Sequence, residues 1–117
     1  MPEAIRIQLP IPPSLNNAYG SRKDGRGRYP TKALRDWKVA AGWTIQAAPK
    51  RRIAEKYSIS ISVSETMRGD IDNRVKFLTD ALVANRVTPD DRFAYSISVT
   101  RSPDVDPGQC IVEVAPV

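Results

Sequence analysis

The strictest pattern in the chain is an alternation of apolar and polar residues over residues 57–65. In "YSISISVSE", serines separate four apolar side chains, which are those of Tyr57, Ile59, Ile61 and Val63. Successive side chains of a β-strand point to opposite faces, so the segment predicts a strand with one buried and one solvated face. The segments "AIRIQL", "FAYSISVTR" and "CIVEVA" predict three further strands.

Two helical patterns separate these strands. The first helix is expected after Pro30, with Thr31 as its N-cap, and Pro49 closes it. Its core-facing residues are Leu34, Trp37, Ala41 and Ile45. The second helix is expected over residues 70–86, "DIDNRVKFLTDALVANR". Its core-facing residues are Ile71, Val75, Leu78 and Leu82.

The order of these elements predicts an α+β fold. We expect a mixed sheet of about four strands, with two helices packed most simply on one face. The last two strands are expected to pair with each other as an antiparallel hairpin. A length of 117 residues suits a single domain, residues 1–117, with one modest core.

Two absences in the composition restrict the chemistry. The chain has no histidine and one cysteine, Cys110. This excludes Ser-His-Asp and Cys-His catalysis, zinc–histidine sites and an intrachain disulfide. Carboxylates and water would have to hold any catalytic metal, which favours Mg²⁺ or Mn²⁺. The sequence shows no bilayer-spanning apolar run and no signal-peptide pattern, so we expect a cytoplasmic protein without a membrane partner.

The charge is divided unevenly along the chain. Residues 1–60 hold 12 Lys and Arg against 4 Asp and Glu, whereas residues 61–117 hold 6 against 9. A basic half beside an acidic half suggests a polyanionic partner that approaches a carboxylate site, although a solvated basic surface explains the charge equally well. The basic residues gather in an expected exposed loop or hairpin tip. The candidate contacts to DNA in this loop are Arg22, Lys23, Arg26, Arg28 and Lys32.

The segment "RGDIDNRVKFLTDAL", residues 68–82, allows two interpretations. In the structural one, Asp70 caps the second helix, Asp72 interacts favourably with the helix dipole, and Asp72 forms an i,i+4 ion pair with Lys76. In the functional one, the carboxylates hold a divalent ion against a phosphodiester. Lys76 then neutralises charge on the phosphate or holds the attacking water.

A second acidic pair, Asp90 and Asp91, follows the second helix in "TPDD". In a strand–helix–strand unit, the helix starts at one edge of the sheet and the next strand starts at the other. Simple connectivity therefore keeps the two acidic clusters apart. A long strand, a short helix or a loop that folds back would be needed to join them.

Four segments occur in one order: "LPIPPSLNNAYG", "RKDGRGR", "RGDIDNRVKFLTDAL" and "TPDD". Together they closely resemble the RusA family of Holliday-junction resolvases, small phage-associated endonucleases of DNA recombination and repair. The resemblance implies a homodimer that binds four-way DNA junctions and cuts two strands symmetrically with Mg²⁺ or Mn²⁺.

By position, the resemblance implies that Asp70, Asp72 and Asp91 are metal ligands, Lys76 is the catalytic lysine and Asp90 is a less certain ligand. It also implies that Asp91 joins the first two aspartates. Family members can carry several arginines before the first aspartate. Here only Arg68 stands there, and it completes the set of candidate DNA contacts.

Two other functions use the same residues. A nucleic-acid-binding module without catalysis would use the basic loop together with Tyr19 and Tyr29, and its acidic residues would be structural. A nuclease of broad specificity would cut linear duplex DNA as fast as a four-way junction. Cleavage of a synthetic junction in Mg²⁺, compared with linear duplex, separates the three.

Overall fold

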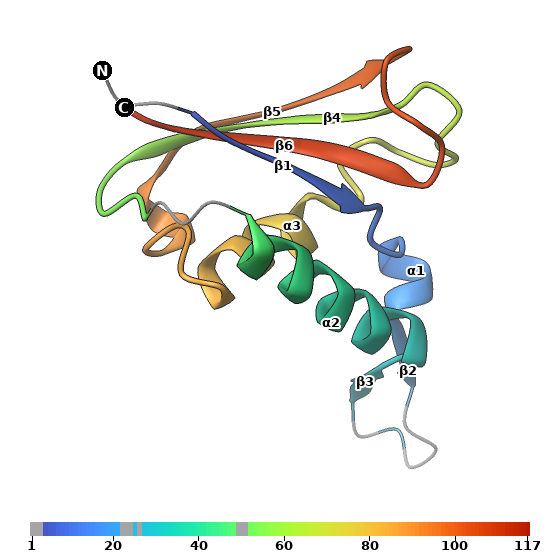
Figure 1. Ribbon diagram of the computed structural model, residues 1–117. Coiled ribbons are helices and arrows are strands. Elements are labelled where there is room, and N and C mark those ends of the chain that lie inside the picture. The colour runs from blue at the N-terminus through green and yellow to red at the C-terminus, as the bar shows by residue number, and fades with distance from the viewer. Residues whose placement is uncertain (1–3, 22–24, 26, 49–51) are drawn as a thin grey trace.

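The structure is a computed structural model that describes residues 4–21, 25, 27–48 and 52–117. It confirms the predicted α+β class, because helices cover one face of a four-stranded mixed sheet (Figure 1). The elements in chain order are β1 (Ile5–Pro10), α1 (Leu15–Ala18), β2 (Tyr19–Ser21), β3 (Arg28–Pro30), α2 (Lys32–Ala47), β4 (Tyr57–Ser64), α3 (Val75–Ala84), a 3-10 helix η1 (Asp91–Phe93), β5 (Ala94–Ser102) and β6 (Gln109–Pro116).

The strands of the main sheet follow the order β1-β6-β4-β5. β4 and β5 run parallel, with α3 as the crossover between them, and β6 runs antiparallel to both β1 and β4. The predicted hairpin between the last two strands is therefore wrong. Cys110, Val112 and Val114 of β6 are fully buried, whereas Tyr95 and Ile97 of β5 are exposed. The more apolar strand takes the interior position, and β5 is left at the edge.

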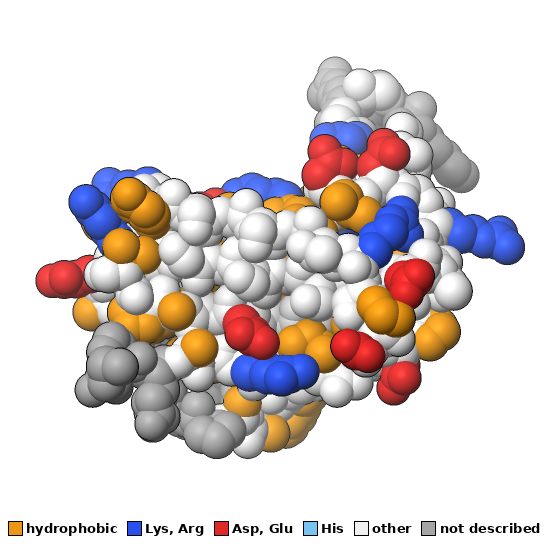
Figure 2. Space-filling model, turned by 90° about the horizontal axis from the view of Figure 1, so that it is seen from above, with side chains coloured by type: hydrophobic (Ala, Val, Ile, Leu, Met, Phe, Trp, Pro, Cys, Tyr) orange, Lys and Arg blue, Asp and Glu red, His pale blue; other side chains and the backbone are white. Residues whose placement is uncertain are grey.

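The alternation that predicts β4 is confirmed. Its four apolar side chains are buried in the core beneath the sheet, and its serines point to the opposite face. There, the hydroxyl groups of Ser96 and Ser98 on β5 donate to those of Ser58 and Ser60 on β4, at 2.9 and 3.4 Å. Figure 2 looks onto this uncovered face, where few charged side chains lie near the centre.

The first predicted helix is also confirmed. The Thr31 side chain accepts a hydrogen bond from the Leu34 backbone N–H at 3.4 Å, and all four predicted core residues of α2 are buried. The Trp37 indole N–H donates to the Pro10 carbonyl at 2.7 Å, which fixes α2 against the end of β1. Within the described residues, no helix is both long and apolar enough to cross a membrane.

The predicted basic loop forms a hairpin that projects away from the main sheet (Figure 1). Its two strands, β2 and β3, pair antiparallel, with Gly20 opposite Tyr29. A Cβ at Gly20 would lie 2.4 Å from the Tyr29 ring, so the close approach of this ring requires glycine. The strand β2 contacts α1 and β3 contacts α2, so the two strands are attached to the helical layer.

Candidate active site

Asp70 and Asp72 lie in an irregular connection between β4 and α3, residues 65–74, and not in a helix. The Asn73 N–H donates to the Asp70 carbonyl at 3.2 Å, and the Val75 N–H donates to the Asp72 carbonyl at 3.3 Å, so this part of the connection is a turn. We call residues 70–74 the acidic turn. Arg74, and not Asp70, stands at the N-cap position of α3. The predicted helix start and the capping role of Asp70 are therefore wrong.

The part of this connection before the acidic turn is held by Arg101 of β5. The Arg101 guanidinium donates to the backbone carbonyls of Met67 at 2.6 Å, Gly69 at 2.8 Å and Glu65 at 3.3 Å. β4 and β5 are parallel, with Val63 opposite Arg101, so Arg101 stands beside the point where the chain leaves β4. The acidic turn thus follows a segment that is tied to the neighbouring strand.

Lys76, in the first turn of α3, makes two ion pairs. Its Nζ lies 2.5 Å from Asp91 Oδ2 and 3.0 Å from Asp80 Oδ1. The predicted i,i+4 pair with Asp72 is wrong, because Asp72 precedes the helix and lacks helical spacing to Lys76. The contact with Asp91 shows that α3 is short enough, and the following loop folds back far enough, to bring the second acidic cluster to the start of α3.

This fold-back is built on the core. The Ile53 N–H donates to the Val87 carbonyl at 2.9 Å. The hydroxyl of Tyr57, a fully buried residue, donates to the Asp90 carbonyl at 2.9 Å. The Asp90 carboxylate accepts from the Arg92 N–H at 3.0 Å and so caps η1, which leaves Asp91 as the member of the pair that faces Lys76.

The ion pair shifts the pKa of both partners. The hydrogen bond from Lys76 lowers the pKa of Asp91, and the hydrogen bonds to Asp91 and Asp80 raise the pKa of Lys76. Both groups are therefore charged at neutral pH. The Lys76 side chain is 63% exposed and the Asp91 side chain is 41% exposed, so a phosphate from solution can reach both.

The predicted metal ligands lie in two places in this structure. Among the residues that it describes, no three acidic or cysteine side chains lie close enough together to hold a metal ion. The donors nevertheless suit a hard cation chemically, because all three are carboxylates. Asp70 and Asp72 are exposed and Asp91 is partly exposed, so an ion can approach each of them from solution. Their assignment as one ligand set stays a prediction.

Comparison with known families decides the class of protein. Residues 10–115 match the family described as Endodeoxyribonuclease RusA. The chain belongs to the RusA family. Membership supports endodeoxyribonuclease activity and, in general terms, the resolution of Holliday junctions. No curated protein matches the chain significantly.

The candidate DNA contacts of this RusA-family chain are only partly described. Arg22, Lys23 and Arg26 lie outside the described residues. Arg28 is exposed on β3, with its guanidinium 4.9 Å from the centre of the Tyr19 ring. Lys32 is exposed but pairs with Asp36 at 2.5 Å. Arg68 is exposed two residues before Asp70, so it stands beside the acidic turn.

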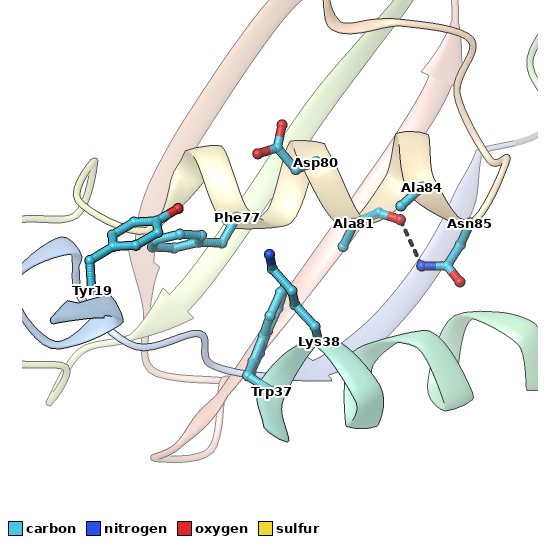
Figure 3. A pocket seen from close by; sticks show the side chains of 8 residues that line it. All are labelled: Tyr19, Trp37, Lys38, Phe77, Asp80, Ala81, Ala84 and Asn85. Carbon is cyan, nitrogen blue, oxygen red and sulfur yellow. Dashed lines mark hydrogen bonds between the residues drawn. The ribbon is translucent and has the colours of Figure 1, made fainter. Parts of the chain in front are cut away.

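A pocket of about 180 Å³ lies between α2 and α3 (Figure 3). Asp80 both lines this pocket and accepts from Lys76. The rings of Tyr19 and Phe77 lie side by side at one end, with centroids 6.1 Å apart. The pocket thus extends from Tyr19, at the base of the hairpin, to Asp80, an ion-pair partner of Lys76.

Three residues that shape the site were not predicted from the sequence. Asp80 is an i,i+4 partner of Lys76 and was visible in the sequence once the helix start was known. Arg101 left a signal as well, because it occupies an apolar position in the alternation of Tyr95, Ile97 and Val99. The hydrogen bond of Tyr57 left none, because the alternation predicts only that its ring is buried.

Proposed function

We propose that the chain is a metal-dependent endonuclease that resolves four-way DNA junctions by paired, symmetric cuts. One observation carries the proposal beyond family membership. Lys76 Nζ lies 2.5 Å from Asp91 Oδ2, although 14 residues separate the two in sequence. This contact brings the acid that follows α3 to the lysine in the first turn of α3, which supports a site that uses both.

In this proposal, Asp70, Asp72 and Asp91 hold Mg²⁺ or Mn²⁺. When bound, the ion would supply Lewis-acid activation of the phosphodiester and of a water. The carboxylates must be ionised to serve, and the Lys76 contact that lowers the pKa of Asp91 supports this at neutral pH. The acidic turn would supply its two carboxylates from a connection without helical constraints, which leaves room for a small closing movement.

Lys76 acts on the phosphate. It is a fixed positive charge because its hydrogen bonds to two carboxylates raise its pKa, so it cannot serve as a general base at neutral pH. Its exposed ammonium is suited to stabilise negative charge that develops on phosphate oxygens in the transition state. Its long stem allows it to exchange Asp91 or Asp80 for the phosphate without movement of α3.

The basic hairpin and Arg68 are proposed to bind the DNA backbone on either side of this site. Each phosphate contact that is lost should reduce the slope of log affinity against log salt by about 0.9 for duplex DNA. We therefore expect Arg22, Lys23, Arg26 and Arg28, replaced together by alanine, to weaken binding to any DNA and to flatten its salt dependence. An unchanged slope would remove the hairpin from the interface.

We propose a homodimer as the active unit. A four-way junction has two-fold symmetry and needs two opposed cuts, and one chain carries one Lys76–Asp91 site. Sedimentation of the protein at micromolar concentration, alone and with a junction, tests this assembly. A chain that stays monomeric on the junction would leave a nicking enzyme and remove the paired cuts.

The decisive experiment compares a synthetic four-way junction with linear duplex, in Mg²⁺ and in EDTA. We expect Mg²⁺-dependent cuts at symmetric positions of the junction and little cleavage of the duplex. Equal cleavage of both would indicate a nuclease of broad specificity. Tight junction binding without cleavage in Mg²⁺ or Mn²⁺ would favour the non-catalytic binding module, in which the Lys76 ion pairs only stabilise the fold.

A further inference from the structure

Arg101 is unusual because it ends an apolar row. The two residues before it on the same face of β5 are Ile97 and Val99, which pair with Ile59 and Ile61 of β4. Arg101 is paired with Val63 of β4, whose side chain is buried on the face that the helices cover. Arg101 itself lies at the exposed edge of the sheet, and its guanidinium is turned to the backbone of the segment that leaves β4.

The three acceptors of Arg101 are alternate carbonyls, those of Glu65, Met67 and Gly69. A guanidinium presents five N–H donors in a planar fork, and bonds from a charged donor are stronger than neutral ones. The last acceptor matters most. The Gly69 carbonyl belongs to the rigid peptide unit that also contains the Asp70 nitrogen, so this bond fixes the plane from which the acidic turn starts.

Apart from Arg101, the packing of Met67 and Ile71 against the core and a few local hydrogen bonds hold this connection. Ser64 and Thr66 hydrogen-bond each other at the start of the connection, and the acidic turn closes on itself at its end. Gly69, between them, has φ +88°, a conformation open mainly to glycine and therefore a point at which the backbone can change direction. The bond from Arg101 reaches the chain at this point, between Met67 and Ile71, which pack on the core.

We propose that Arg101 is a positioning residue, which holds the acidic turn in the conformation in which Asp70 and Asp72 bind a divalent cation. The inference rests on the function proposed above. In this role Arg101 acts through the backbone, since its guanidinium donates to the carbonyls of Glu65, Met67 and Gly69. Its contribution is to set the direction of two carboxylates before the metal arrives.

The test compares Arg101→Met, Arg101→Lys and the matched control Arg6→Met. Arg6 is an exposed arginine on β1, the opposite edge strand of the same sheet. The readouts are the Mg²⁺ concentration for half-maximal cleavage, Mn²⁺ binding by electron paramagnetic resonance, junction binding in EDTA and the thermal unfolding midpoint. Loss of a partner that orients metal ligands weakens metal affinity by roughly 10- to 100-fold.

For Arg101→Met we expect a shift of about that size in both metal readouts, with the cleavage rate recovered in excess Mg²⁺ and junction binding in EDTA unchanged. Arg101→Lys keeps the charge but cannot span three carbonyls, so it should lie between wild type and Arg101→Met. Arg6→Met should behave as wild type. If the Arg101→Met variant does not fold, the Arg101→Lys variant becomes the test. Wild-type metal affinity in Arg101→Lys would then overturn the proposal.

Failure of this proposal differs from failure of the proposed function. Wild-type Mn²⁺ binding in Arg101→Met, together with lost binding in Asp72→Asn, would overturn the role of Arg101 and keep the metal site. Wild-type Mn²⁺ binding and cleavage in Asp72→Asn would overturn the metal site itself. A fall in junction binding in EDTA for Arg101→Met would reassign Arg101 to direct contact with DNA.

Discussion

The two segments that carry the acidic residues are held in different ways. Residues 85–93 are fastened to the core through the Tyr57 hydroxyl and the backbone of Ile53, and Asp90 caps their short helix. Residues 65–74 are held by the Arg101 guanidinium of β5, which lies near the surface, and by Met67 and Ile71, which pack against the core but are only partly buried. One segment is fixed by a fully buried tyrosine, the other by an exposed charged side chain, partly buried apolar residues and its own turns.

The two kinds of attachment indicate where the site is rigid and where it can adapt. The packing of β4 and α3 fixes the position of Asp91, so Asp91 and Lys76 form the rigid part of the site. The acidic turn has no fully buried residue, and only its Ile71 packs on the core, so it belongs to the less stable parts of the fold. In the proposed function, Lys76 and Asp91 are therefore the rigid part of the site and the acidic turn is the part that can adjust, so changes in the two segments should have different signatures.

The largest effect is expected for Asp72→Asn in the adaptable segment. Loss of a metal-binding carboxylate should cost more than the roughly 100-fold caused by loss of an outer partner, so cleavage of the junction should fall beyond that value. Junction binding in EDTA should stay the same or tighten slightly, because one repulsion with phosphate is removed. Gel-shift assays measure junction binding and cleavage assays measure the rate, with Asp104→Asn in the exposed β5–β6 turn as the control. Cleavage near the wild-type rate would exclude Asp72 as a ligand.

The next effect is expected for Lys76→Met in the rigid segment. If Lys76 stabilises charge in the transition state, the cleavage rate at saturating DNA should fall by roughly 100-fold or more, with little change in affinity. The pKa of Asp91 should rise, because its hydrogen-bonding cation is gone. Single-turnover kinetics and an NMR titration of Asp91 check both. A loss of affinity alone would make Lys76 a phosphate clamp.

Much of the fold could be predicted because periodicity is a local property. β4 and α2 follow from the spacing of Tyr57, Ile59, Leu34 and Trp37, and from the Thr31 cap. The pairing of the last two strands could not be predicted, because it depends on which strand takes the interior position of the sheet. β6 lies between β1 and β4 with its apolar side chains fully buried, and only the assembled sheet shows which strand takes this interior position.

The site was predicted less completely for a similar reason. The motif around Asp70 and Asp72 has good N-cap chemistry, yet the helix starts at Val75. Arg101 holds the preceding backbone, and the sequence gives no means to see a bond between residues 32 apart. That Lys76 would meet Asp91 depends on the length of α3 and on the loop that Tyr57 holds, which are tertiary properties.

A smaller effect is expected for Tyr57→Phe, which tests the rigidity of residues 85–93. The change leaves the Asp90 carbonyl without its hydroxyl partner in a buried place and should cost about 1–2 kcal/mol of stability. That corresponds to a fall of at least about 4 °C in the unfolding midpoint. Tyr95→Phe, at an exposed tyrosine of β5, should change it far less. Equal midpoints in the two variants would show that the hydroxyl does not anchor this segment.

The smallest effect is expected for Asp80→Asn, which asks whether both partners of Lys76 belong to the site. The pair is exposed and has the less favourable order for an i,i+4 pair, with lysine nearer the N-terminus, so its loss should change stability by no more than about 0.5 kcal/mol. Lys76 keeps Asp91, so cleavage should stay within about twofold, an energy difference near 0.4 kcal/mol. Asp91→Asn, the matched change on the other partner, should abolish cleavage because it removes a predicted ligand. Equal losses of cleavage in the two variants would show that Asp80 belongs to the site, which would then extend along α3 toward the pocket.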